Sequence, residues 1–522
     1  MVGLRTFEQP FSGGWRFLII ILLVIGVFFR FANLDHKLYW HDEVYTSLRA
    51  AGFTSKEIGQ EIFQNQILAP QDLQKFQRLK PGSTASYTIR SLAIEDPQHP
   101  PLYFLISRFW MQLFGSSITA SRSLPALLSL LSLPLMYALG LELFFSPLAA
   151  LLTTIFLALS PFDVLFSQIS RQYSFLTVAI ICSSFLLLKA LRLPTLPNWG
   201  LYTLATVIGL YTHAFFGLTI IGHFFFIVFH FINKENRTED AFKFFISITA
   251  TIGIYSPWLI VLITNSQRAL DTTSWSSGSV DVLLLVKLWI LSFTALFLDL
   301  DFGFDSIWTY LLRLPIILLI AVAIYTVCRR TNRTTWLFIL TSIFVPFLML
   351  ALPDLLSGGR RSAVSRYLIS CYPGVQLAVA YFLKNRILKG QKIWRVVLAL
   401  LVTSSIASCT VSALADTWWS NVPSYSNAEV AREINANPAP LLISDVGNDG
   451  TNLGDLISLS YLLNQDVRLL LLSQIPDLKL LANKSNAFVF RPSESLSKAL
   501  QQQKRRLKNV LPSRQLWQMQ NY

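Results

Sequence analysis

The sequence predicts a polytopic α-helical membrane protein of about eleven transmembrane helices, followed by a small soluble α/β domain. Hydrophobic residues make up 53% of the 522 residues and charged residues only 14%, whereas soluble proteins carry about 25% charged residues. Many apolar runs approach the roughly 20 residues that cross a bilayer. After residue 415 polar segments take over, so we expect a membrane domain over 1–415 and a separate domain over 416–522.

The first apolar run is expected to be a retained anchor, because Arg5 and Arg16 precede it and no small-residue cleavage site follows. Two other runs are expected not to cross. The first run is Val282–Leu298, which contains Lys287. If it crossed the membrane, the basic loops after it would lie on the outer side, so we expect an in-plane or re-entrant segment. The second run, Leu102–Phe114, is short, and we expect a helix at the outer surface. The eleven expected spans are 17–33, 122–144, 148–166, 173–192, 199–216, 217–233, 243–262, 308–328, 335–352, 367–383 and 395–414.

The net charge of +14 would suggest nucleic-acid binding in a soluble protein. Here the basic residues gather in short loops between spans, as the positive-inside rule describes, so we expect a membrane lipid partner and no nucleic acid. The rule predicts a multi-pass protein of the cell membrane with a cytoplasmic N-terminus, and it places the loop 33–100 and the C-terminal domain outside. The basic loop residues are Lys189, Arg192, Lys234, Arg237, Arg329, Arg330, Arg333, Lys384, Arg386, Lys389, Lys392 and Arg395.

The C-terminal domain shows alternating helical and strand-like patterns and no catalytic motif, so its role is open. The expected helices are Asn427–Ile434, Leu453–Leu463 and Ser495–Lys504, and the expected strands are Pro440–Ser444, Val467–Leu472 and Ala487–Phe490.

Ionisable residues at membrane depth are costly, so each is a candidate for function. The first group is Trp40-His41-Asp42-Glu43, just after the first span. Adjacent carboxylates do not both face the same way on an extended loop, so one suits a general base while the other orients a neighbour or pairs with a cation. The alternative is a solvated start of a loop.

The second group is Asp96 and His99, in a proline-rich segment where the chain re-enters the apolar layer. The prolines fix the backbone and would hold both side chains at the interface. The alternative is a helix start with Asp96 near the N-cap.

Three arginines, Arg360, Arg361 and Arg366, lie within seven residues and are followed by Tyr367. This side of the membrane is expected to carry few cations, so the arginines predict an anionic partner, and guanidinium groups suit phosphate oxygens. Contact with lipid headgroups without specificity is the alternative.

Smaller signals come from single polar residues near outer ends of spans. They are Arg30, Arg122, Asp163 and His213. A separate candidate group is Ser167–Tyr173, between two spans on the outer side, which contains Arg171 and Tyr173. A lone histidine such as His213 is more often a packing residue than a base. The sequence has no HExxH, Cys/His cluster, Walker loop or GxGxxG, so neither a metal nor a nucleotide cofactor is expected.

Taken in order, five segments resemble the GT-C glycosyltransferases, in particular the family 39-like bacterial proteins related to protein O-mannosyltransferases and lipid A aminoarabinose transferases. The resemblance covers about residues 15–415. These segments are Arg30 with Trp40–Glu43, His99–Tyr103, Arg122–Pro125, Ser167–Tyr173 and Ser365–Tyr367. Family members often carry an acidic residue where Ile169 stands, so Arg171 and Tyr173 are the expected contributors from that segment.

The resemblance implies transfer of a sugar from a polyprenyl-phosphate carrier to an acceptor hydroxyl on the outer face, with inversion at C1. The acceptor would be a protein, a glycolipid or a polysaccharide. The implied base is Asp42 with Glu43 in support, and the substrate-binding residues would be Arg30, His41, Asp96, His99, Arg122, Arg171, Tyr173, His213, Arg360, Arg361, Arg366 and Tyr367.

Two other functions fit a chain of this kind. A flippase or transporter of lipid-linked sugars would be supported by inverted repeats, and the sequence shows no internal symmetry. A non-catalytic membrane scaffold would leave the external arginines unexplained.

Overall fold

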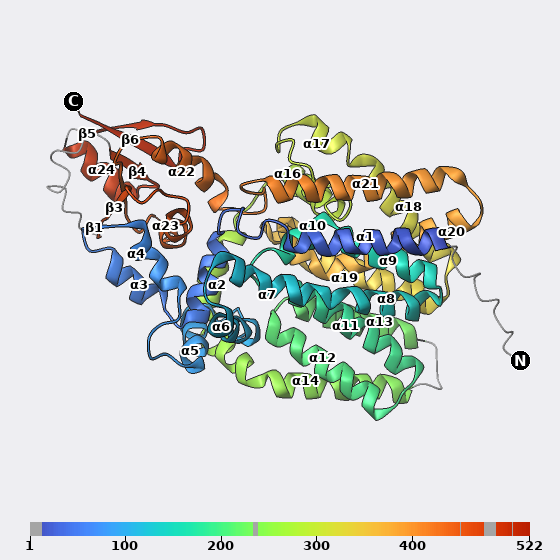
Figure 1. Ribbon diagram of the computed structural model, residues 1–522. Coiled ribbons are helices and arrows are strands. Elements are labelled where there is room, and N and C mark those ends of the chain that lie inside the picture. Colours follow the sequence, from blue (N-terminus) through green and yellow to red (C-terminus); the bar gives the residue numbers. More distant parts are fainter. Residues whose placement is uncertain (1–12, 233–237, 449, 474–486, 504, 522) are drawn as a thin grey trace, which may run out of the picture.

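The computed structural model describes residues 13–232, 238–448, 450–473, 487–503 and 505–521. A long bundle of helices forms one part of the molecule. Helices of the first loop and the C-terminal sheet gather at one end of that bundle (Figure 1).

Each of the eleven expected spans coincides with a helix or a pair of consecutive helices. Six described stretches are long and apolar enough to cross a membrane, or seven if the bent pair α9–α10 is one span. The chain is therefore a multi-pass membrane protein, and the count of eleven stays a prediction. The helices are α1(Gly13–Phe31), α7(Ile118–Leu130), α8(Ser132–Phe144), α9(Pro147–Leu159), α10(Pro161–Ser167), α11(Tyr173–Arg192), α12(Leu196–Thr212), α13(Phe216–Phe231), α14(Thr238–Thr264), α17(Ile307–Leu311), α18(Leu314–Arg330), α19(Arg333–Ser357), α20(Tyr372–Leu388) and α21(Lys392–Leu414).

The two segments expected not to cross both form helices of 13 residues, α6(Leu102–Phe114) and α16(Val282–Thr294). A helix of this length falls short of the roughly 20 residues that span a bilayer. Lys287 of α16 extends over the rings of Phe304 and Tyr310, at 5.7 and 5.4 Å from their centroids. Aromatic faces attract an ammonium group in this position.

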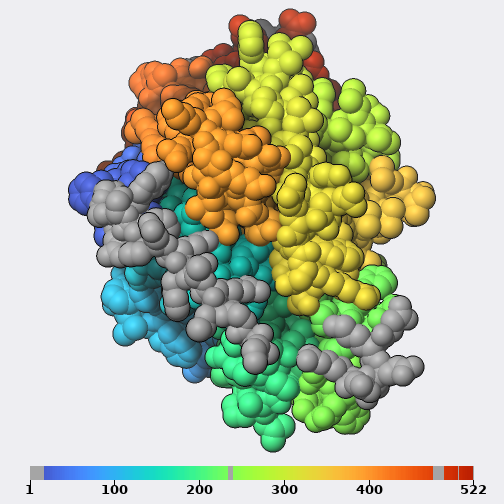
Figure 2. Space-filling model, turned by 90° about the vertical axis from the view of Figure 1, so that its right-hand side faces the viewer, coloured from blue at the N-terminus to red at the C-terminus, as the bar shows by residue number. Residues whose placement is uncertain are grey.

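The basic loops lie together at the end of the bundle away from the C-terminal sheet. Arg192 pairs with Glu142 at 2.5 Å, and Arg333 donates to the carbonyl of Phe229 at 2.9 Å. Figure 2 looks onto this end, where segments near residues 140, 330 and 390 share one face. Lys234 and Arg237 lie outside the described residues.

The C-terminal segment forms the expected helices α22(Asn427–Asn435), α23(Asn452–Ser460) and α24(Glu494–Gln502) and the expected strands β2(Leu441–Ser444), β3(Arg468–Leu471) and β4(Ala487–Phe490). Two further strands, β5(Arg505–Asn509) and β6(Leu516–Asn521), extend the sheet. The strand order is β1-β3-β2-β4-β6-β5, in which β1 is Gln66–Leu68, and β2 runs parallel to both β3 and β4.

The edge strand β1(Gln66–Leu68) comes from the first loop, which also forms α2(His41–Ala51), α3(Ser55–Ile62), α4(Pro70–Gln74) and α5(Ala85–Glu95). It pairs antiparallel with β3, with Ile67 opposite Leu470. Side chains from the first loop and from the C-terminal segment pack in one apolar cluster. The two segments therefore share a core, and the domain boundary near residue 416 stays a prediction.

The bundle contains a break at which α9 and α10 meet at 54°. Pro161 has no backbone N–H, so carbonyls of α9 lose their helical donors there. Arg30 of α1 supplies them: its guanidinium donates to the carbonyls of Leu157 and Ala158 at 3.1 and 2.6 Å. A Cβ atom on Gly26 would lie 2.6 Å from the Ala158 carbonyl oxygen, so glycine allows α1 to approach α9 this closely.

This arrangement predicts that Arg30→Leu destabilises the protein, because it leaves buried carbonyl groups without donors, at about 1–3 kcal/mol for each group. The unfolding temperature of the detergent-solubilised protein should fall by several degrees. Arg395→Leu, on the exposed face of α21, is the matched control and should have little effect. An unchanged unfolding temperature in Arg30→Leu would contradict this structural role.

Candidate active site

The carboxylates Asp42 and Glu43 lie in the first turn of α2, at the end of the bundle that carries the C-terminal sheet (Figure 1). Glu43 accepts a hydrogen bond from the backbone N–H of Trp40 at 3.0 Å, which fixes the start of the helix. Successive helical residues differ in direction by about 100°. The two side chains therefore meet different surroundings.

Glu43 is fully buried and fully bonded. Arg122 of α7 donates two hydrogen bonds to Glu43, from Nε to Oε1 at 2.9 Å and from Nη2 to Oε2 at 2.7 Å. The backbone N–H of Ser170 donates to Oε1 at 2.7 Å. Arg122 also donates to the carbonyls of Leu34, Lys37 and Leu38. These two residues tie the first loop to α7 and to the segment before α11.

Asp42 lies near two guanidinium groups, but they leave its hydrogen-bonding capacity unused. Its Oδ2 lies 3.7 Å from Nη2 of Arg366 and 4.0 Å from Nη2 of Arg171. The Asp42 side chain is 21% exposed, and within the described ranges its carboxylate accepts no hydrogen bond. Its oxygens therefore remain available to a proton donor.

Arg366 is held among the rings of Trp40, Trp275 and Tyr367, with its guanidinium carbon 5.0, 5.8 and 5.5 Å from their centroids. Stacking of this kind orients the planar guanidinium group while leaving its edge free to donate.

Arg171 is positioned by hydrogen bonds, to Thr46 Oγ1 at 3.1 Å and His99 Nε2 at 3.3 Å. Its guanidinium carbon also lies 5.8 Å from the ring centroid of Tyr173. The Nε atoms of Arg171 and Arg366 are buried and have no hydrogen-bond partner among the described residues. Two buried, under-bonded guanidinium groups beside one carboxylate form a site that suits an anion.

His99 acts here as a neutral acceptor. Burial, together with the positive charge of Arg171, lowers the pKa of His99 to about 4. The neutral ring can accept the hydrogen bond from Arg171 at Nε2, and the Gln172 amide lies 3.1 Å from Nδ1. His213 lies 5.9 Å from both the His99 ring and the Tyr173 ring, and its Nδ1 accepts from the N–H of Phe215 at 3.0 Å.

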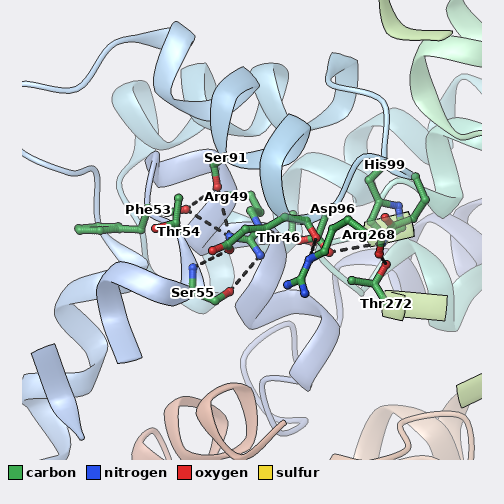
Figure 3. A network of polar contacts seen from close by, with 12 residues as sticks. Thr46, Arg49, Phe53, Thr54, Ser55, Ser91, Asp96, His99, Arg268 and Thr272 are labelled. Atoms are coloured by element: carbon green, nitrogen blue, oxygen red, sulfur yellow. Dashed lines mark hydrogen bonds and ion pairs between the residues drawn. The ribbon is translucent and has the colours of Figure 1, made fainter. Parts of the chain in front are cut away.

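Asp96 holds α2 from the side rather than facing Asp42. Its Oδ2 accepts from Nε of Arg49 on α2 at 2.6 Å, and Arg49 also pairs with Glu95. Figure 3 shows Arg49 at the centre of this network, between Asp96, Ser91 and Ser55. Burial opposes the charge on Asp96, but Arg49 outweighs it and lowers the pKa of Asp96.

His41 points away from the Asp42 group and toward the C-terminal segment. Its Nδ1 lies 3.4 Å from Oδ1 of the fully buried Asp455. Burial disfavours the protonated ring, but the Asp455 carboxylate outweighs it and raises the pKa of His41. A Cβ atom on Gly454 would lie 2.6 Å from His41 Nδ1, so α23 approaches α2 very closely here.

Among the described contacts of Arg360, Arg361 and Arg366, only those of Arg366 include Asp42. Arg360 donates to the carbonyl of Trp275 at 2.9 Å and lies over its ring. Arg361 lies 3.9 Å from Asp354, which also accepts from the N–H of Ser362 at 2.6 Å. These contacts hold the segment that presents Arg366.

Tyr367 packs edge-on against Phe215, with the ring centroids 4.4 Å apart. Arg30, at the α9–α10 break, contacts none of the residues around Asp42. The structure therefore brings together Asp42, His99, Arg171, Tyr173, His213, Arg366 and Tyr367.

Several residues around Asp42 were not singled out from the sequence. Trp275 lies beside Arg366 and belongs to a segment without a distinctive pattern. Gln172 lies beside His99 and belongs to the segment Ser167–Tyr173, from which only Arg171 and Tyr173 were expected to contribute. Lys37 lies in the first loop with only 5% exposure, and its Nζ has no hydrogen-bond partner among the described residues. Burial, together with Arg122, lowers the pKa of Lys37 to about 8. In the part of the chain that the structure describes, no three His, Cys, Asp or Glu side chains lie close enough to hold a metal ion.

Glu43→Gln should destabilise the protein by about 3–5 kcal/mol, because it leaves Arg122 as an uncompensated buried charge. Asp42→Asn should change stability by less than about 1 kcal/mol, since Asp42 is partly exposed and loosely paired. Thermal unfolding of the two purified variants, followed by tryptophan fluorescence, distinguishes them. Equal losses of stability in the two variants would contradict the assignment of Glu43 as the buried structural carboxylate and Asp42 as the loosely paired one.

Comparisons with known proteins agree with this architecture. A family model described as dolichyl-phosphate-mannose-protein mannosyltransferase matches residues 98–261, a range that contains His99, Arg122, Arg171, Tyr173 and His213. No curated protein sequence matches the chain.

Among solved structures, the chain resembles ArnT from Cupriavidus metallidurans bound to undecaprenyl phosphate, with 13% identity, 98% of each chain covered and a TM-score of 0.54. The apo form of that protein gives a TM-score of 0.55 at 13% identity, with 97% of each chain covered. The oligosaccharyltransferase of Archaeoglobus fulgidus tethered with an acceptor peptide gives a TM-score of 0.53 at 12% identity, over 86% of this chain and 64% of that one. The chain thus has the fold of the GT-C superfamily of membrane glycosyltransferases.

Proposed function

We propose that the protein transfers a sugar from a polyprenyl-phosphate carrier to an acceptor hydroxyl at the end of the bundle where α2 lies. The proposal rests on the partly exposed and loosely paired carboxylate of Asp42, which lies beside the buried guanidinium groups of Arg366 and Arg171. A base next to an anion site is what such a transfer requires. The match to a mannosyltransferase family and the likeness to ArnT support the same reaction class.

The two arginines would bind the phosphate of the donor. When the bond between sugar C1 and the phosphate oxygen breaks, negative charge develops on the leaving phosphate. Arg366 and Arg171 each have a buried Nε that has no hydrogen-bond partner among the described residues and can donate to this phosphate. Because rings and hydrogen bonds already hold both groups, they need little reorganisation as the charge forms.

Asp42 would act as the general base. It takes the proton of the acceptor hydroxyl as that oxygen attacks C1 from the side opposite the phosphate, so the anomeric centre inverts. A general base typically contributes about 10²–10⁴ to the rate. Glu43 supports this step without touching substrate, because its bonds to Arg122 fix the first turn of α2.

The outer face of the membrane is the side on which we place this reaction. The basic loops gather at the opposite end of the bundle, which the positive-inside rule assigns to the cytoplasm. The N-terminus of α1 lies at that same end (Figure 1). The C-terminal sheet and the first loop would then both be extracytoplasmic.

Purified protein incubated with a panel of polyprenyl-phosphate sugars and candidate acceptors should release bare polyprenyl phosphate, as measured by mass spectrometry. Asp42→Asn should lower this release by at least about 10²-fold while insertion into the membrane persists, because the base is lost. Full activity in that variant would remove Asp42 as the base. Movement of intact donor across vesicles without any release would favour a transporter.

Arg366→Ala should raise the apparent KM for the donor by about tenfold or more and change that for the acceptor much less, because a charge-assisted contact to phosphate is lost. Steady-state kinetics with each substrate varied in turn measures the difference. Arg90→Ala, which removes the same charge from an exposed side chain on α5, is the control. Equal effects of the two variants on the donor would contradict the assignment of Arg366.

A further inference from the structure

A cavity of about 830 Å³ lies in the C-terminal segment, away from Asp42. Residues that follow β2 and β4 form one side of it, and α24, β5 and the turn into β6 form the other. It is lined by Gly447, Asn448, Asn452, Arg491, Pro492, Ser497, Gln501, Arg505, Arg506, Leu507, Arg514, Gln515 and Trp517.

The cavity lies at the point where the sheet topology creates a crevice. Strands β2 and β4 are parallel neighbours in the centre of the sheet. The chain leaves β2 toward β3 on one side and leaves β4 toward β5 and β6 on the other. Neighbouring parallel strands whose connections diverge in this way leave a crevice at their carboxyl ends, which is where ligands bind in open α/β sheets.

The lining of the cavity is strongly cationic. It contains four arginines, Arg491, Arg505, Arg506 and Arg514, and no Asp or Glu among its described residues. Arg491 is held in place because it pairs with Asp455 and donates to Thr451 Oγ1 at 2.9 Å. A guanidinium group oriented in this way favours a phosphate or carboxylate ligand.

Two buried carbonyl oxygens in the lining lack donors. Asn452 is 1% exposed, and its Nδ2 donates to the carbonyls of Asp445 and Arg491, both at 2.9 Å. These bonds fix the amide, and its Oδ1 has no partner among the described residues; the same holds for Oε1 of Gln515. Unpaired buried acceptors call for a ligand with hydroxyl or amide donors.

The indole of Trp517 adds an aromatic surface beside the arginines. Aromatic rings pack against the apolar C–H face of a sugar, whose hydroxyl groups donate to nearby carbonyls. We propose that this cavity binds an anionic saccharide. Its phosphate or carboxylate contacts the arginines, its hydroxyls donate to Asn452 and Gln515, and one sugar ring lies on Trp517. The inference goes beyond the proposed transfer reaction and does not depend on it.

Direct binding to the full-length protein in detergent tests the proposal, with a fluorescent heparin-derived hexasaccharide as the charged probe and maltohexaose as the neutral one. In about 150 mM salt, where long-range attraction is screened, the charged probe should bind at least about tenfold more tightly than the neutral one. Arg506→Ala and Arg514→Ala should each weaken its binding by about tenfold, the effect of one lost hydrogen bond to a charged group.

The matched control is Arg432→Ala, which removes the same charge from an exposed site on α22 outside the cavity. Losses in the cavity variants no larger than in this control would overturn the proposal, and so would equal affinity for the two hexasaccharides. Competition by inorganic phosphate as strong as by unlabelled heparin hexasaccharide would reduce the site to a phosphate site and overturn the saccharide assignment. Asp42→Asn should bind the charged probe like the wild type, so failure of the transfer reaction and failure of this site are distinguishable.

Discussion

The buried ion pair between Glu43 and Arg122 is the constraint on which the candidate site depends. A carboxylate taken out of water needs full compensation, and Glu43 obtains it from a guanidinium group and two backbone N–H groups. These donors belong to α7, to the start of α2 and to the segment before α11. The pair therefore determines how three distant parts of the chain meet, which is a gain in specificity more than in stability.

Helix α2 is held at two further points. Arg49 anchors its last turns to Asp96 and Glu95 on one flank, and His41 meets Asp455 of the C-terminal segment at its first residue. A side chain carried on an element supported from several sides is held close to one position, as catalytic geometry requires. In this arrangement Asp42 is the acidic residue of the first turn that retains free acceptor capacity.

The apolar runs predicted the helices of the bundle well, because the thickness of a bilayer imposes one length on every span. Strands β2 to β4 were likewise visible as short runs of mainly aliphatic and aromatic residues. Strand β1 was not predicted, since three residues carry too little pattern and its partner β3 lies about four hundred residues later in the chain. The number of spans that cross remains a prediction.

The division of roles within the site could not be read from the sequence. Asp42 and Glu43 have the same chemistry, and only their partners, Arg366 and Arg171 for one and Arg122 for the other, separate them. Arg30 looked like an external cation for substrate, but the broken helix at Pro161 supplies carbonyls that engage it. Arg360 and Arg361 resemble Arg366 in sequence, but they contact Trp275 and Asp354 instead of Asp42.

The pairing of β1 with β3 has a consequence for the synthesis and folding of the protein. The ribosome produces the first loop about four hundred residues before β3, and helices α6 to α21 of the chain are made between the two. Strand β1, in the loop that carries Asp42, therefore has no partner until β3 has been made and delivered to the same compartment. A chain that has not yet produced β3 would lack this partner strand, so Asp42 would reach its final setting only after β1 and β3 have paired.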